Sequence, residues 1–71
     1  MRDVAIRPGG IALGQFLKFA ELADSGGMAK VLLADGVVRV NDEVETRRGR
    51  RLVAGDVVGV DGSVAVRVVE G

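Results

Sequence analysis

The sequence predicts an α+β domain in which a two-helix hairpin packs on a small, mostly antiparallel sheet. Two features of the apolar pattern support this fold class. Apolar residues recur with helical spacing between residues 11 and 34, and with a period of two from Val38 onward. Helices on one side of short, turn-linked strands are typical of α+β domains. The chain has 71 residues, which suffices for a single domain with a small core.

The first helix is expected to run from about Ile11 to Leu22. Four apolar residues fall at i, i+3, i+4 and i+7 on one face: Leu13, Phe16, Leu17 and Ala20. Lys18 and Glu21 lie off this stripe and are expected to face water. Before the helix, the run Val4-Ala5-Ile6 predicts an edge strand, and Pro8-Gly9-Gly10 separates the two elements.

A second helix is expected from about Gly27 to Ala34. Its apolar face is supplied by Met28, Ala29, Leu32 and Leu33. Either Asp24 or Ser25 is a suitable N-cap, because a side-chain oxygen accepts hydrogen bonds from the free N–H groups of a helix start. Gly36 lies where a left-handed C-terminal cap is expected. Since only a few residues link the two helices, we expect them to pack together as a hairpin.

Short strands and tight turns are expected after the helices. Val38 and Val40 point to one face of a strand, and Asn41-Asp42 is a candidate for a two-residue turn because both residue types tolerate positive φ. Glu43 and Glu45 share a face of the next strand and are expected to be solvated carboxylates. The other expected elements are a return strand over 43–46, a turn over 52–56, a strand over 57–60, a turn at 61–62 and a strand over 63–69.

The composition argues against an enzyme, a metal site and a bound cofactor. The chain has no Cys and no His, which removes the commonest nucleophile, general base and metal ligands. Ser25 and Ser63 are its only serines and have no His to activate them. Turn chemistry explains the aspartates that lie beside turns: Asp35, Asp42, Asp56 and Asp61.

The overall charge alone predicts no polyanionic partner, since ten basic residues balance ten acidic ones. No apolar run approaches the ~20 residues that a membrane-spanning helix needs. The N-terminus lacks the apolar stretch of a secretory signal. We therefore expect a cytoplasmic protein with no membrane partner.

The segment from Arg47 to Arg51 is the one dense cluster of charge, because four of its five residues are Arg. Neighbouring guanidinium groups repel one another, and a bound anion relieves the repulsion. The planar fork of Arg matches phosphate oxygens, and Gly49 allows both arginine pairs to face one surface. The pattern predicts a phosphate-binding site. The alternative is a solvated loop whose arginines pair with Glu43 and Glu45.

Lys30 is a second candidate phosphate ligand. It lies near the start of the second predicted helix, where free N–H groups and the helix dipole favour an anion; the alternative is a solubilising lysine. Lys18 is expected to serve solvation. The only aromatic residues are Phe16 and Phe19, and Phe16 lies in the core stripe, so we expect no platform for stacked bases. A nucleic acid would be held by its backbone and shape, which favours structured RNA or a duplex.

Four segments carry a resemblance to a known family. They occur in this order and at family-like spacing: Leu13-Gly14-Gln15-Phe16-Leu17-Lys18, Ser25-Gly26-Gly27-Met28-Ala29-Lys30, Gly36-Val37-Val38-Arg39-Val40-Asn41, and Arg47-Arg48-Gly49-Arg50-Arg51-Leu52 followed by Gly55-Asp56-Val57-Val58. The chain resembles the S-four RNA-binding domain, also called the αL motif. It is most similar to the stand-alone bacterial YaaA/YbcJ-like small proteins. The resemblance covers about Ile11 to Val60.

The resemblance implies an α+β domain that binds structured ribosomal RNA or tRNA through the phosphate backbone, with the ribosome or a ribosomal subunit as a further partner. It implies no cofactor and no small-molecule substrate. In the family, RNA lies over the N-terminal part of the second helix and the following hairpin. Carried onto matching positions, the RNA-binding residues are Ser25, Gly26, Gly27, Lys30, Asn41, Arg47, Arg48, Arg50 and Arg51.

Other function classes are weaker alternatives. A protein-interaction adaptor without direct RNA contact would use an edge strand such as Val4-Ala5-Ile6. A binder of duplex DNA would need a recognition helix, and the second predicted helix offers only Lys30 for base reading. An enzyme is the least favoured class, for want of His, Cys or an activated Ser.

Overall fold

The computed structural model describes residues 1–63 and 65–71 and confirms the α+β class. Two helices and several short strands follow one another along the chain. In order they are β1 (Arg2–Ile6), β2 (Ile11–Ala12), α1 (Leu13–Phe19), α2 (Gly26–Ala34), β3 (Val38–Val40), β4 (Glu43–Val44), β5 (Arg51–Leu52), β6 (Val57–Val60) and β7 (Val66–Glu70). None of the helices in this part of the chain is long and apolar enough to cross a membrane.

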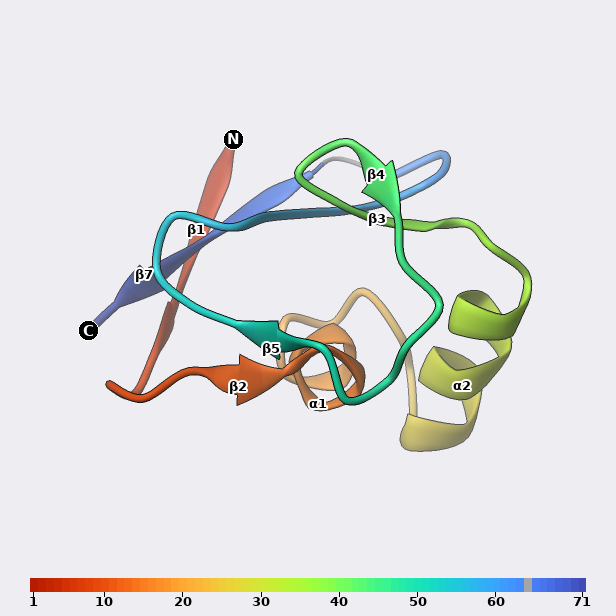
Figure 1. Ribbon diagram of the computed structural model, residues 1–71, viewed down its shortest axis with the longest axis horizontal. Coiled ribbons are helices and arrows are strands. Elements are labelled where there is room, and N and C mark those ends of the chain that lie inside the picture. The colour runs from red at the N-terminus through yellow and green to blue at the C-terminus, as the bar shows by residue number, and fades with distance from the viewer. Residues whose placement is uncertain (64) are drawn as a thin grey trace.

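The main sheet has five strands in the order β1-β7-β6-β3-β4. Only β1 and β7 pair in parallel, and the other neighbours are antiparallel. A second, two-stranded sheet joins β2 to β5. Both helices lie on the same side of the main sheet, with β1 and α2 at opposite ends of the molecule (Figure 1). The predicted edge strand around Val4 is therefore confirmed as β1.

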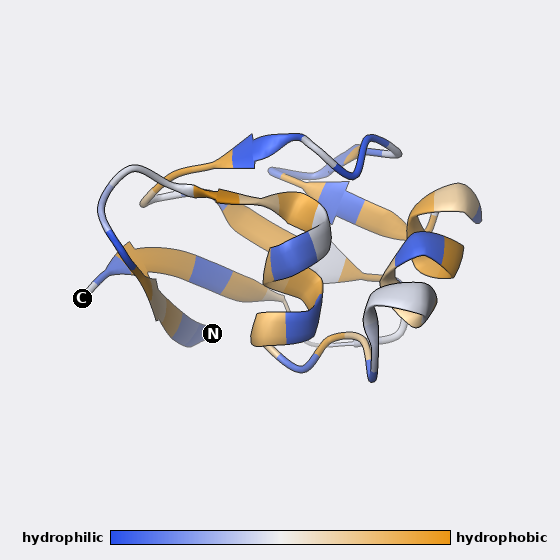
Figure 2. Cartoon of the chain, turned by 90° about the horizontal axis from the view of Figure 1, so that it is seen from below, coloured by the Kyte–Doolittle hydropathy of each residue, from blue (hydrophilic) through white to orange (hydrophobic). Residues whose placement is uncertain are grey.

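The helices and the sheet enclose a small core. The core includes three fully buried side chains of α1: Phe16, Leu13 and Leu17. It also includes Val38 and Val40 of β3, which have at most 2% of their surface exposed. Arg39, between the two valines, is exposed, which confirms the predicted alternation. Apolar residues run along the strands near α1, and charged residues alternate with them (Figure 2). The predicted apolar stripe of the first helix thus forms the centre of the core.

The first helix is shorter than predicted. Ile11 and Ala12 form β2, paired with Leu52 and Arg51, so α1 begins only at Leu13. It ends at Phe19 because Glu21 adopts a left-handed φ of 60°, and the N–H groups of residues 22 and 23 turn back to the carbonyl of Leu17. The prediction of one helix over 11–22 was wrong at both ends.

The later strands also differ in extent. The predicted return strand over 43–46 contains only β4, and Leu52, expected in a turn, belongs to β5. The predicted strand over 57–60 is confirmed as β6. The strand expected over 63–69 corresponds to β7, which starts at Val66; Val64 in that stretch lies outside the described residues. Short pairings such as β2–β5 leave too few residues for a period of two to be recognised.

Local turn chemistry was predicted well. Ser25 is the N-cap of α2, because its Oγ accepts a hydrogen bond of 3.1 Å from the N–H of Met28. Gly36 follows α2 with a φ of 72°, as a left-handed cap requires. Asn41 and Asp42 have φ values of 53° and 70°, which is the geometry of a tight hairpin turn between β3 and β4.

Candidate nucleic-acid interface

The segment from Arg47 to Arg51 is fixed against the beginning of α1 by its backbone. The N–H of Leu13 donates to the carbonyl of Arg50 at 2.8 Å, and the N–H of Gly14 donates to the carbonyl of Arg48 at 2.9 Å. The first N–H groups of a helix lack partners within the helix, and α1 has no side-chain cap. The carbonyls of the arginine segment therefore serve as its cap.

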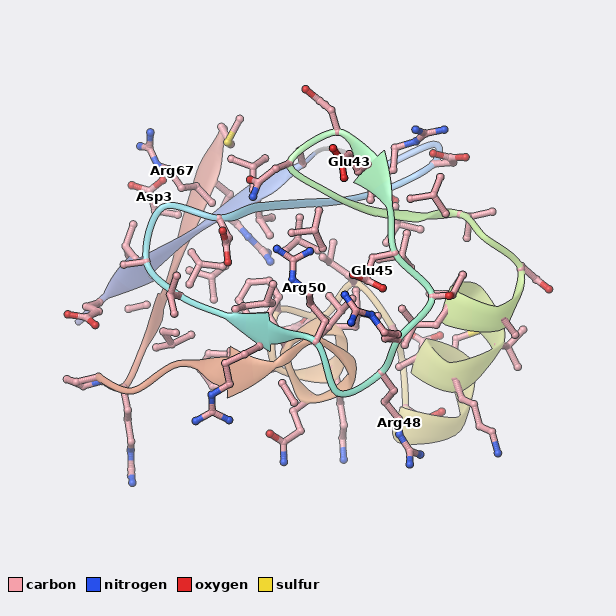
Figure 3. All side chains as sticks on the ribbon, viewed as in Figure 1. Asp3, Glu43, Glu45, Arg48, Arg50 and Arg67 are labelled. Atoms are coloured by element: carbon pink, nitrogen blue, oxygen red, sulfur yellow. The ribbon has the colours of Figure 1, made fainter. Side chains whose placement is uncertain are left out.

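Glu45 is the one charged side chain that is buried among the described residues, with 9% of its surface exposed. It accepts hydrogen bonds from the backbone N–H, Nε and Nη2 of Arg47 at 3.0, 3.1 and 3.1 Å. Arg50 donates to the same carboxylate through Nη1 at 3.4 Å. Glu45 and Arg50 lie close together near the centre of the view in Figure 3. The expectation that Glu45 is a solvated carboxylate was wrong.

This pairing changes the titration of both partners. The side-chain hydrogen bonds from Arg47, helped by its backbone N–H and by Arg50, lower the pKa of Glu45 from 4.5 to about 2. The same hydrogen bonds raise the pKa of the Arg47 guanidinium. Glu45 is therefore ionised at neutral pH and compensates charge on Arg47 and Arg50.

The sequence predicts that both arginine pairs of the segment face one surface. In the structure, their guanidinium groups do not converge. Arg47 and Arg50 are bound to Glu45. Arg51 points to another segment and donates from Nε and Nη2 to the carbonyl of Gly9, at 3.2 and 2.9 Å. Arg48 has no side-chain hydrogen bond or ion pair within residues 1–63 and 65–71. The alternative of arginines paired with a nearby carboxylate is correct for two of the four.

Arg48 extends from the segment toward the start of α2 (Figure 3). Its aliphatic stem packs directly on Gly14 of α1, where an added Cβ would lie only 2.5 Å from Cγ of Arg48. No other residue type fits at Gly14 unless Arg48 moves. Gly14 therefore positions Arg48 and does so from a buried site on the helix.

Arg48 separates two adjoining hollows, which we call the Arg48 groove. The first, of about 470 Å³, is lined by Ala12, Gly14, Gln15, Lys18, Gly26, Ala29, Arg48 and Gly49. The second, of about 300 Å³, is lined by Lys30, Leu33, Ala34, Thr46 and Arg48. The charged side chains of this lining are all cations, and none is a carboxylate. A domain without net charge thus has a strongly cationic groove at the start of α2.

The structure brings together some of the predicted RNA-binding residues and separates others. Gly26, Lys30 and Arg48 line the Arg48 groove, with Ser25 and Gly27 beside Gly26 at the start of α2. The guanidinium groups of Arg47, Arg50 and Arg51 are bound elsewhere, as described above.

Asn41 also lies apart from the Arg48 groove, in the β3–β4 turn on the other side of the molecule from the start of α2 (Figure 1). Its amide donates to Asp56 at 3.1 Å and accepts from the N–H of Val57 at 2.9 Å. The Asn41 side chain therefore joins the hairpin turn to the start of β6.

Three groove residues on α1 escaped the sequence interpretation. Lys18 was assigned to solvation, and Gly14 and Gln15 were noted only as part of a motif. The signal that would have found them is helical spacing: Gly14 and Gln15 lie four and three residues before Lys18, so each of them neighbours Lys18 on the surface of α1.

Comparisons with known proteins agree with this fold and motif set. Residues 4–69 match the model of the family described as the S4 domain. The chain is 54% identical over 59 residues to the probable ribosome maturation protein RlbA of Bacillus subtilis, covering 83% of each chain. It is 39% identical over 52 residues to YbcJ of Escherichia coli, provisionally named an RNA-binding protein, covering 73% of this chain and 74% of YbcJ.

A solved structure is similar as well. The solution structure of YbcJ from E. coli matches with a TM-score of 0.67 at 35% identity, over 96% of this chain and 84% of that one. Its title describes an αL motif involved in RNA binding. The folds of the two chains therefore correspond over nearly the whole length of the present one.

Proposed function

Because the chain belongs to the S4 domain family, we propose that it binds RNA and that the Arg48 groove receives the phosphate backbone. The observation that carries the assignment of the groove is the Arg48 guanidinium, which has no partner among the described residues and is held beside the start of α2 by Gly14. Arg presents a planar set of donors that matches phosphate oxygens.

The start of α2 supplies the second half of the site. The N–H groups of Gly26 and Gly27 lie at the first positions of the helix, where no carbonyl of the same helix accepts them. The helix dipole adds a partial positive charge at this end. Lys18 and Lys30 flank Arg48 in the two hollows, so a phosphate chain passing through the groove meets a cation on each side of Arg48.

The groove is suited to binding rather than catalysis. Its polar side chains are two lysines, one arginine, the amide of Gln15 and the hydroxyl of Thr46, and no His or carboxylate is among them to act as a general base. No aromatic ring lines it, which favours contacts to the RNA backbone over base stacking. We therefore assign the protein a non-enzymatic role.

We propose structured ribosomal RNA as the ligand, with tRNA as the alternative. The support is the relative RlbA, whose name describes ribosome maturation, together with a groove whose charged side chains are cations and whose described lining includes no aromatic ring for base stacking. On this proposal the protein works in the cytoplasm, with ribosomal subunits as its partners.

The test compares two charge-matched variants, Arg48→Ala and Arg67→Ala. Arg67 is an exposed arginine on β7 that pairs with Asp3 at 3.0 Å, far from the groove. We expect Arg48→Ala to weaken binding of a ribosomal RNA fragment by about tenfold and to reduce the slope of log K against log salt by about 0.7 to 0.9. Arg67→Ala should leave both values nearly unchanged. Equal losses in the two variants would contradict the assignment of the groove.

A further inference from the structure

Strand β1 has an unpaired edge. The carbonyl of Ile6 accepts a hydrogen bond from the N–H of Gly71 at 3.2 Å, so the backbone of Ile6 faces β7. Successive residues of a strand direct their backbone groups to opposite sides. Asp3 and Ala5 therefore present their N–H and C=O groups to the open side of the sheet, where the strand order ends at β1.

Two hollows follow this edge, and we call them together the β1 groove. One, of about 420 Å³, is lined by Ala5, Ile6, Arg7, Gly10, Ile11, Phe19 and Gly71. The other, of about 310 Å³, is lined by Arg2, Asp3, Val4, Ala5, Phe19, Ala20 and Glu21. The second hollow contacts four consecutive residues of β1, from Arg2 to Ala5. Because the side chains of consecutive strand residues point to opposite faces of the sheet, a hollow that contacts all four lies along the edge of the strand. The other wall of the groove is the end of α1.

Phe19 lies between the two hollows with 59% of its surface exposed, whereas Phe16, the other aromatic residue, is fully buried. The mechanism of RNA binding does not use Phe19, because it lines neither half of the Arg48 groove. An exposed aromatic ring next to unpaired backbone groups is typical of the centre of a protein interface.

The two ends of the β1 groove carry opposite charges. Arg7 lies at one end and Glu21 at the other, and neither side chain has a hydrogen bond or ion pair within the part of the chain that the structure describes. Of the other charged side chains of the groove, Asp3 is compensated by Arg67, and Arg2 keeps its positive charge while it donates to the carbonyl of Ala20. The groove is thus complementary to a segment with an acidic residue at one end and a basic residue at the other.

We propose that the β1 groove binds an extended segment of a partner protein, which adds a strand to β1. An apolar side chain of that segment packs on Phe19, an acidic residue pairs with Arg7 and a basic residue pairs with Glu21. This site is separate from RNA binding, because β1 lies at the opposite end of the molecule from α2 (Figure 1). RNA and the partner segment can therefore be bound at the same time.

The test selects random nine-residue peptides, displayed on phage, against the whole chain, and measures the selected peptides as synthetic molecules with blocked ends. We expect them to combine bulky apolar residues with an acid and a base at opposite ends, and to shift the amide resonances of Asp3 and Ala5. Ala5→Pro removes an outward N–H at a place where an edge strand tolerates proline. It should raise the peptide Kd about five- to tenfold, and so should Phe19→Ala.

Two controls keep this test independent of RNA binding. Val53→Ala removes another exposed apolar side chain, and it should leave peptide binding unchanged. RNA affinity measured on Ala5→Pro and Phe19→Ala should equal that of the wild type, which also reports that both variants fold. The proposal is overturned if no peptide is enriched, if the peptides bind both variants as they bind the wild type, or if two copies of the chain pair through β1 instead. A loss of RNA affinity in Phe19→Ala at an unchanged Tm would equally overturn it by assigning the groove to RNA.

Discussion

At the scale of single residues, Gly14 decides where Arg48 lies. A methyl group at this position would lie 2.5 Å from Cγ of Arg48, too close for the stem to stay. We expect Gly14→Ala to weaken RNA binding as much as Arg48→Ala does, about tenfold, and the double variant to bind no worse than either single one. Gly59→Ala is the matched control, because its Cβ would make only an ordinary contact of 3.7 Å. Additive losses would show that Gly14 acts independently of Arg48.

Glu45 gives a prediction on pH at the same scale. Its pKa is about 2 in the folded protein and 4.5 in an unperturbed carboxyl group, so its ionised form stabilises the fold above about pH 4.5. This stabilisation is lost as the pH falls from there toward 2. We expect the difference in Tm between the wild type and Glu45→Gln to be constant above about pH 5 and to shrink steadily below it. A difference that does not change with pH would show that Glu45 contributes by packing and not by its charge.

At the scale of elements, Ser25 is expected to stabilise α2 as its N-cap and to contribute little to RNA affinity. Its hydroxyl is engaged with the N–H of Met28, as an N-cap. Ser25→Ala should reduce the free energy of unfolding by about 1 kcal/mol and Tm by roughly 4–8 °C, as the loss of a cap does in a domain of this size. RNA affinity measured well below Tm should change less than twofold, with Ser63→Ala as the control. A tenfold loss of affinity without a loss of stability would instead show a direct contact to RNA.

The elements that could be predicted are those fixed by nearby residues. The start and end of α2 and the β3–β4 turn depend on Ser25, Gly36 and Asn41-Asp42, whose conformations are set within a few positions. The β2–β5 pair joins residues about forty positions apart and has only two residues per strand, so no periodicity reveals it. The start of α1 was missed for the same reason, because a distant segment supplies its cap. Its other end was missed because Glu21 adopts a left-handed φ, which its residue type does not signal.

The candidate site shows the same division. Sequence reasoning named Arg48, Lys30 and the start of α2, which line or adjoin the Arg48 groove, because composition and the helix pattern mark them. It also included Arg47 and Arg50, since a run of arginines does not reveal which of them face a buried carboxylate. That distinction depends on Glu45, whose burial arises from tertiary packing and not from its neighbours in the sequence. Lys18 was missed because Arg48, which lines the same hollow, lies thirty residues away in the sequence.

At the scale of the whole molecule, the cations on the sheet differ from those in the Arg48 groove in whether they are paired. On the sheet, Arg39 and Arg67 pair with Asp61 and Asp3 at 3.3 and 3.0 Å. In the groove, Lys18, Lys30 and Arg48 have no such partner among the described residues. The net charge of zero is therefore uninformative about RNA binding, because it sums a neutralised surface and a cationic one.

This division predicts the salt dependence of RNA binding. If the three groove cations neutralise three phosphates, the slope of log K against log salt should be about −2 to −3. If Arg47, Arg50 and Arg51 left their present partners and also bound phosphates, six contacts would steepen the slope to about −4 to −5. Titrations of a ribosomal RNA fragment between about 50 and 300 mM salt separate the two values. The steeper slope, falling back to about −2 to −3 in an Arg47→Ala, Arg50→Ala and Arg51→Ala variant, would show that RNA releases the arginines from Glu45 and Gly9.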